Sequence, residues 1–234
     1  IDELIELFTI FKNNCKSLFV VNQSNTLAKS LSANSTNDFG FEDKNAGFSA
    51  ENFKQDGLYL TFDIRDQHFQ MNSLGQHSVE NATAAIAVAN QIGVDLKTCE
   101  ESLANYEGIY RRHQVLGQNN GVWVIDDYAH NPAKCAASIK AVQPLANKVI
   151  AWFQPHGYKP TRFLKDDFIQ EISDALRPED EIFMSEIFYA GGTAVKDISA
   201  NDLILGIKEK GKKAHFIEDR NDLLKALRPE LKQG

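Results

Sequence analysis

The chain has 234 residues, 43% of them hydrophobic and 24% charged, with a formal net charge of −7 at pH 7. This composition is that of a globular protein, and the length suits one large domain or two small ones. The acidic balance argues against a general nucleic-acid or anionic-membrane binder. No apolar run reaches membrane-spanning length and no secretory signal opens the chain. We therefore expect neither nucleic acid nor a membrane among its partners.

The cysteines and the chain ends give two further expectations. Cys15, Cys99 and Cys135 are widely spaced and odd in number, so they indicate no disulfide framework or metal site, and a reducing cytoplasm is expected. Ile1 stands where a start methionine would, and Gly234 directly follows a predicted helix, where an alternating fold would add a strand. We expect both ends to be cuts in a larger protein.

The first half of the chain predicts helices combined with a small antiparallel sheet. Periodicity predicts helices over 4–13, 26–31, 78–92 and 97–105. Short β segments are predicted over 18–21, 38–41, 46–53, 58–64 and 68–71. The run 58–64 alternates apolar and polar residues, as in a strand with one wet face, and the breaks at 55–57 and 65–67 suit hairpin turns.

From Gly121 the pattern changes to alternating strands and helices. The predicted strands are 122–126, 148–153, 181–184 and 214–217, and the predicted helices are 133–142, 163–176, 201–209 and 222–227. This alternation predicts an α/β fold in which a mainly parallel sheet has helices on both faces. We place the boundary near Tyr110, which divides the chain into domains 1–109 and 110–234.

The stretch Val122–Pro132 has the most informative spacing. Four apolar residues, three of them β-branched, predict a buried strand that stops at Asp126 and Asp127. Asn131 is a candidate N-cap and Pro132 suits the first turn of a helix. Ligands of α/β sheets bind at this kind of strand end, near helix N-termini. A capped turn without further function remains the alternative.

Polar clusters elsewhere are compatible with ligand binding and with ordinary surfaces. His77 and Asn81 lie four residues apart, so they share a helix face that suits an adenine edge, or form a cap and a surface amide. The pair Arg111-Arg112 suits a phosphate, or is a solvated pair of charges. Cys135 is expected to pack rather than react.

A further loop, 154–162, follows the second strand of the alternating region. It holds an imidazole, a phenol and two cations, which suit a carboxylate or a phosphate; the alternative is a helix cap, with Thr161 as N-cap, and incidental charges. After the third strand, Gly191-Gly192 allows unusual backbone angles or a close approach to a ligand. No Walker A loop, nucleophile elbow or His-Glu-x-x-His zinc motif occurs.

Four strings in this order resemble the Mur ligases, closest to the members that add alanine or a murein peptide. They are Gly75-Gln76-His77-x-x-x-Asn81-Ala82, Gly108-x-Tyr110-Arg111-Arg112, Asp126-Asp127-Tyr128-Ala129-His130-Asn131-Pro132 and Phe153-Gln154-Pro155-His156-x-Tyr158. The likeness runs from about Leu18 to the end. It implies the later part of a central ATPase domain and most of a Rossmann-like C-terminal domain, with the P-loop and most Mg²⁺ ligands before Ile1.

The resemblance also implies a function. A Mur ligase uses ATP and Mg²⁺ to activate the carboxylate of a UDP-N-acetylmuramate-type substrate as an acyl phosphate, which the amine of an amino acid or peptide then attacks. The family would make this a cytoplasmic ligase of peptidoglycan synthesis, inactive as a fragment. The alternative is a non-catalytic module that binds nucleotides or muramyl precursors. The Asp-Asp-Tyr-Ala-His string argues against a folate- or cyanophycin-type relative.

The family's site residues carry over position by position. His77 and Asn81 match positions near adenine, Arg112 a position near the ATP phosphates, and Asp127 one near the ribose. The positions that face the substrate carboxylate or the incoming amino acid are matched by Tyr128, His130 and His156. Among these, Arg112 and His130 are the candidate catalytic residues.

The chain departs from the family pattern at four positions. Asn after the first motif's histidine is replaced by Ser78, and a second histidine of the Asp-Asp-Tyr motif by Asn131. Two arginines of the alanine-adding members become Gly157 and Pro160. A bidentate carboxylate clamp is thereby lost.

Two cations of the same loop remain as candidates for that carboxylate. They are Lys159 and Arg162. Because Thr161 is expected to cap the following helix and to draw Arg162 away, the sequence favours Lys159.

Overall fold

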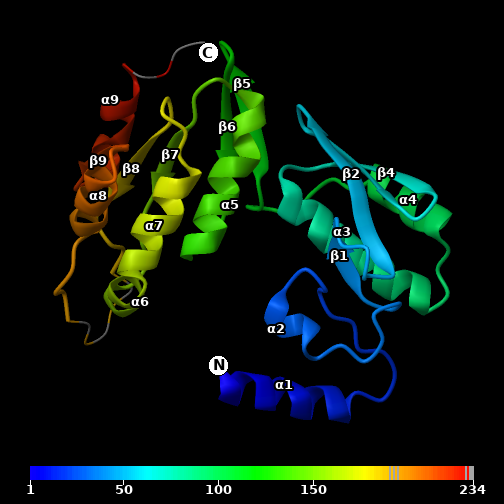
Figure 1. The fold of residues 1–234 in the computed structure, drawn as a ribbon. Coiled ribbons are helices and arrows are strands. Elements are labelled where there is room, and N and C mark those ends of the chain that lie inside the picture. Colours follow the sequence, from blue (N-terminus) through cyan, green and yellow to red (C-terminus); the bar gives the residue numbers. More distant parts are fainter. Residues whose placement is uncertain (190, 192, 194, 230, 232–234) are drawn as a thin grey trace. The chain divides into compact units, whose positions relative to one another are not determined.

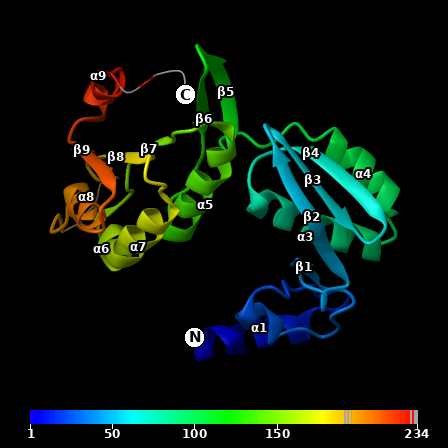
Figure 2. The same cartoon turned by 45° about the horizontal axis from the view of Figure 1, so that its top comes forward.

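The computed structural model describes residues 1–189, 191, 193, 195–229 and 231. The chain forms two compact units, Ile1–Gly108 and Ile109–Gly234 (Figures 1 and 2). Each unit has its own hydrophobic core. This division lies beside the boundary predicted near Tyr110. Among the described residues, no helix combines the length and apolar character needed to cross a membrane.

The first unit is a four-stranded sheet with helices. Its elements are α1 (Asp2–Asn14), α2 (Thr26–Lys29), β1 (Phe39–Phe41), β2 (Phe48–Asp56), β3 (Tyr59–Ile64), β4 (Gln67–Asn72), α3 (Gln76–Gln91) and α4 (Leu96–Ala104). The strand order is β1-β2-β3-β4, with antiparallel pairing from β2 to β4 and parallel pairing between β1 and β2. The predicted strand over 18–21 is wrong, because pairing there is limited to a single bridge between Asn22 and Phe39.

The core of the first unit lies between the sheet and α3. Leu60 and Phe62 of β3 are fully buried, and the Phe62 ring stacks on that of Phe69 in β4 with centroids 5.4 Å apart. Val79 and Ile86 provide the buried face of α3. The predicted two-residue periodicity of β3 is therefore confirmed, and it leaves the opposite side of α3 free for polar residues.

The second unit contains the alternating part of the chain. Its elements are β5 (Gln114–Asn119), β6 (Val122–Asp126), α5 (Pro132–Val142), η1 (Gln143–Leu145), β7 (Ile150–Phe153), α6 (Tyr158–Phe163), α7 (Lys165–Ala175), β8 (Glu181–Ser185), α8 (Ala200–Glu209), β9 (Lys213–Ile217), η2 (Arg220–Asp222) and α9 (Leu223–Leu227). Strands β7, β8 and β9 form the predicted parallel sheet in that order. The helix predicted over 163–176 forms as α7, and the sequence analysis missed the separate helix α6 before it, which begins directly after Gly157.

Strand β6 corrects one prediction. It pairs antiparallel with β5, which the sequence did not indicate, in a separate two-stranded sheet. Val124 is 52% exposed, so the predicted buried strand is wrong. A β-branched run has the same local pattern in a central strand and in a ribbon, and its pairing partner decides how much of it is covered.

One hydrophobic core organises the second unit. Ile139 of α5, Ile172 of α7 and Leu203 of α8 meet the buried side chains of β8, including Met184. On the other face of the sheet Trp152 is 45% exposed. Within the described residues, the helical cover expected on both faces is therefore seen mainly on one.

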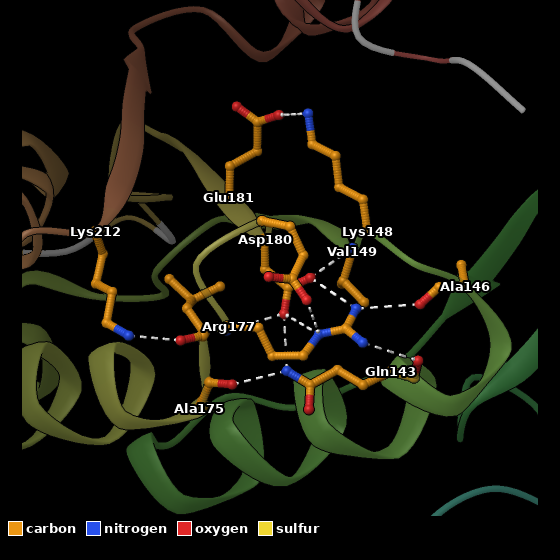
Figure 3. Close-up of polar contacts among 11 residues, drawn as sticks. Gln143, Ala146, Lys148, Val149, Ala175, Arg177, Asp180, Glu181 and Lys212 are labelled. Atoms are coloured by element: carbon orange, nitrogen blue, oxygen red, sulfur yellow. Dashed lines mark hydrogen bonds and ion pairs between the residues drawn. The ribbon is translucent and has the colours of Figure 1, made fainter. Parts of the chain in front are cut away.

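A buried carboxylate ties together the amino ends of β7 and β8 (Figure 3). Asp180, 1% exposed, accepts hydrogen bonds from Val149 N at 2.8 Å, Gln143 Nε2 at 2.8 Å and the Arg177 guanidinium at 2.9 and 3.0 Å. Arg177 also donates to the carbonyl of Ala146 at 3.1 Å. Burial would raise the pKa of Asp180, but the hydrogen bonds from Arg177, Val149 and Gln143 together hold it below the ordinary value of 3.8.

Candidate functional site

The turn between β6 and α5 forms as its sequence predicts. β6 ends at Asp126, and the Asn131 side chain accepts a hydrogen bond from Lys134 N at 3.0 Å, which caps α5 with Pro132 in its first turn. This fixes the four residues 127–130 between a strand end and a helix N-terminus. The start of α5 is thus a place where polar side chains can gather around a ligand, although β6 lies outside the parallel sheet.

Asp127 is held by backbone donors from both sides of this turn. Its Oδ1 accepts from Ala129 N at 2.7 Å and its Oδ2 from His113 N at 2.9 Å, with the side chain 15% exposed. The His113 ring lies beside it, with Nδ1 3.2 Å from Oδ2. Oδ2 is occupied by the backbone N–H and the ring of His113, but Oδ1 has a second lone pair, so Asp127 could still accept from a ribose hydroxyl.

His113 belongs to this site, although the sequence did not single it out. Burial lowers its pKa; the charge of Asp127 opposes that shift and Arg112 adds to it. The imidazole is therefore neutral at pH 7 and supports Asp127 by position rather than by charge. Its place directly before β5 was the signal that could have found it, since β5 delivers it to the end of β6.

Two arginines and an aromatic ring lie next to Asp127. Arg111 Nε is 3.2 Å from Asp126 Oδ2, and the guanidinium carbons of Arg111 and Arg112 lie 5.1 and 5.6 Å from the centre of the Tyr128 ring. Both arginines are exposed, and Asp126 neutralises the first. Arg112 is therefore the cation of this pair that is available to a phosphate.

His130 is oriented by the same turn. Its Nδ1 is 3.0 Å from the carbonyl oxygen of Tyr128, and the two rings meet edge to face at 5.6 Å. A carbonyl accepts and never donates, so Nδ1 carries the proton of the neutral ring and Nε2 is left as an acceptor. The exposed ring can therefore take a proton at Nε2.

The loops after β7 and β8 are joined to each other. Phe188 N donates to Pro155 O at 2.8 Å, and Gly157 N donates to Phe188 O at 3.1 Å. The His156 and Phe188 rings are 5.2 Å apart. Gly157 has a φ of +81°, which glycine adopts without strain, and it serves as the N-cap of α6.

The predicted cap Thr161 is wrong, because α6 begins one turn earlier than expected. Thr161 lies inside this helix, and its hydroxyl donates to Gly157 O at 2.7 Å. Arg162 is nevertheless drawn away, since it forms an ion pair with Asp197. Lys159 is exposed in the first turn of α6. Of the predicted Gly191-Gly192 pair, Gly191 is exposed with a φ of +96°, and position 192 lies outside the described residues.

A cavity of about 390 Å³ opens beside the β7 and β8 loops. The residues that line it are Tyr158, Glu186, Lys196, Asp197, Ile198, Ser199 and Asp202. The sequence analysis missed Lys196 because the loop between β8 and α8 has no regular pattern. The signal that could have found it is the capping Ser199 that follows, which fixes where α8 begins.

The adenine candidates lie in the first unit. His77 and Asn81 are both in the first half of α3, four residues apart, with Asn81 exposed and His77 partly so. The His77 Nε2 is 3.5 Å from the Ser78 hydroxyl. They share a helix face, as predicted.

The described residues offer neither a cluster of metal ligands nor, at Cys135, a reactive thiol. No group of three or more histidine, cysteine, aspartate or glutamate residues is placed there to hold a metal ion. We therefore assign no Mg²⁺ ligand to these residues. Burial raises the pKa of the Cys135 thiol to about 12, and the charge of Asp127 adds to the shift, so Cys135 packs in the core as expected.

Comparison with known proteins identifies the family to which the chain belongs. The family model described as "Mur ligase, glutamate ligase domain" matches residues 111–234. The UDP-N-acetylmuramate–L-alanine ligase of Caldanaerobacter subterraneus is 34% identical over 168 residues, which are 71% of this chain and 36% of that protein. Its counterpart in Caldicellulosiruptor bescii is 29% identical over 92% of this chain and 46% of that protein.

Solved structures show the same fold. The UDP-N-acetylmuramate-alanine ligase of Thermotoga maritima has a TM-score of 0.73 at 22% identity, covering 94% of this chain and 47% of that one. MurF of Acinetobacter baumannii also has a TM-score of 0.73, at 17% identity, covering 98% of this chain and 50% of that one. The chain spans less than half the length of the curated relatives named above. It belongs to the Mur ligase family.

Proposed function

We propose that this chain is the later part of an ATP-dependent ligase that joins an amino acid or peptide to a UDP-N-acetylmuramate-type substrate in peptidoglycan precursor synthesis. The observation that carries the proposal is the family match over 111–234, which spans the cluster of Arg112, Asp127 and His130. The work would take place in the cytoplasm, where ATP and nucleotide-linked precursors are available. ATP and Mg²⁺ would be its cofactors, with Mg²⁺ held mainly by residues outside this chain.

Each candidate residue has a proposed role in this function. Asp127 accepts a hydrogen bond from the ribose, and Arg112 stabilises the negative charge that develops on the transferred phosphate. His77 and Asn81 hold the adenine edge. Tyr128, His130 and His156 face the substrate carboxylate and the amine, and Lys159 and Arg162 are candidates for the carboxylate of the incoming amino acid.

The test is a ligation assay with the full-length protein. We expect release of phosphate from ATP that requires both UDP-N-acetylmuramate and an amino acid or peptide, and a product whose mass equals the two joined with loss of water. A panel of amino acids and short peptides identifies the substrate. Nucleotide binding without any product would instead favour a non-catalytic binding module.

His130 has a separate expected effect. In the full-length ligase, His130→Gln should lower kcat by roughly 10- to 100-fold with little change in the KM for ATP, because the ring nitrogen that takes the amine proton is lost. His68→Gln, an exposed histidine on β4 beside Asp63, is the matched control and should leave kcat unchanged. An unchanged kcat in the His130 variant would remove this residue from the chemistry.

A further inference from the structure

Lys196 differs from the other charged residues around the 390 Å³ cavity. Its ammonium lies 4.3 Å from the centre of the Tyr189 ring and 5.9 Å from that of Tyr158. Among the described residues, no carboxylate forms an ion pair with it. A cation over aromatic faces is held in place while its charge stays available to an anion.

Two carboxylates that line the cavity already accept hydrogen bonds from the start of α8. Glu186 accepts from Ala200 N at 3.1 Å and from the Ser199 hydroxyl at 2.6 Å, and thereby covers the start of α8. Asp202 accepts from Ser199 N at 2.8 Å in the capping box of the same helix. These two acids are therefore committed to the helix N-terminus and do not compete for Lys196.

Arg162 and Lys159, the two cations that the sequence indicated, are placed less well than Lys196 to bind an anion in the cavity. The charge of Arg162 is neutralised by Asp197. Lys159 is exposed on α6 and does not line the cavity. Lys196 lines it together with Tyr158, from the motif that follows β7. The cavity's volume of about 390 Å³ lies within the range of small-molecule sites, and the cavity is shallow and widely open to solvent.

We propose that Lys196 binds the carboxylate of the incoming amino acid or peptide and so helps to determine which one is accepted. The proposal rests on the proposed ligase function and names the cation of its second substrate. The anion enters the cavity beside Tyr158 and meets the ammonium, which the two tyrosine rings hold. Because an ammonium is a point charge, this contact selects for an anion with less geometric restriction than a guanidinium fork would impose.

The experiment compares carboxylate substrates with their amides in the full-length ligase. For the amino acid or peptide that the ligation panel identifies, Lys196→Met should raise the KM by roughly 10- to 100-fold, as expected for losing a hydrogen bond to a charged group. The KM for ATP should stay the same. The parent enzyme should prefer the free carboxylate over its carboxamide, and the variant should lose that preference.

Further variants and substrates make the outcome decisive. Lys196→Arg should restore most of the preference, because it keeps the charge, and Lys208→Met, an exposed lysine on α8, should match the parent. Comparing free amino acids with peptides whose carboxyl ends are free or amidated identifies the carboxylate that Lys196 binds. If Lys159→Met or Arg162→Met removes the preference while Lys196→Met keeps it, the proposal is wrong. If the parent ligates nothing, the proposed function fails instead.

Discussion

Replacing Asp180 by alanine is expected to lower the free energy of unfolding of the second unit by roughly 3–5 kcal/mol, the usual cost of breaking a buried ion pair from one side. The Asp180 side chain is fully buried, and it accepts from Val149 N, Gln143 Nε2 and Arg177 (Figure 3). Its removal leaves those donors without their acceptor in a place that water reaches poorly. The amino ends of β7 and β8 would lose their common anchor.

Urea unfolding followed by tryptophan fluorescence measures this effect. The two tryptophans of the chain, Trp123 and Trp152, both lie in the second unit, so the signal reports on it. Glu179→Ala is the matched control, because Glu179 pairs with the same Arg177 at 3.4 Å but is 47% exposed. An exposed pair of this kind contributes under about 1 kcal/mol. Equal losses in the two variants would contradict the anchoring role of Asp180.

The lowered pKa of Asp180 predicts how the stability of the second unit changes at acidic pH. The pKa of Asp180 is lower in the folded chain than its ordinary value, so the folded state binds a proton less readily than the unfolded state does. Its contribution is therefore complete above about pH 4, the unfolded value, and is lost as the pH falls through the lower folded value. The difference in stability between the parent and Asp180→Ala should shrink over that acidic interval.

Local signals were enough to predict most elements of the fold. The Asn131-Pro132 start of α5 depends on neighbouring residues alone, and the structure has it where the sequence predicts it. Strand β5 was missed because Gln114–Asn119 is largely polar and is interrupted by a bulge near Gly117, so no alternation is visible. The pairing of β6 depends on that missed partner, and its exposure could not be predicted without it.

Some residues of the candidate site could likewise be predicted from local sequence, and others could not. Residues 127–130 form one short turn directly after β6, so their common position follows from the strand and helix around them. His113 reaches Asp127 through the pairing of β5 with β6, and Lys196 reaches Tyr158 across the β7 and β8 loops. Such contacts join positions that are far apart in the chain, and no periodicity records them. Only the structure shows these contacts.

Asp127→Ala is expected to lower the free energy of unfolding by about 2–4 kcal/mol, because two backbone N–H groups, of His113 and Ala129, lose their acceptor in a partly buried turn. The sequence alone predicted a contact with nucleotide and little loss of stability on this substitution, because it gave no sign of these two backbone hydrogen bonds. Asp127→Asn keeps the shape and one acceptor oxygen, so its loss should be clearly smaller. Asp126→Ala is the control, since Asp126 is 36% exposed and pairs with Arg111 at the surface.

Nucleotide binding separates the two roles of Asp127. In the full-length ligase, Asp127→Asn should raise the KM for ATP roughly 10-fold, as expected when a charge-assisted acceptor for a ribose hydroxyl becomes neutral. Its kcat at saturating ATP should change little, and Asp126→Ala should leave the KM for ATP near the parent value. If Asp127→Ala unfolds easily while Asp127→Asn binds ATP as the parent does, the carboxylate holds His113 and Ala129 in place and does not bind the ribose.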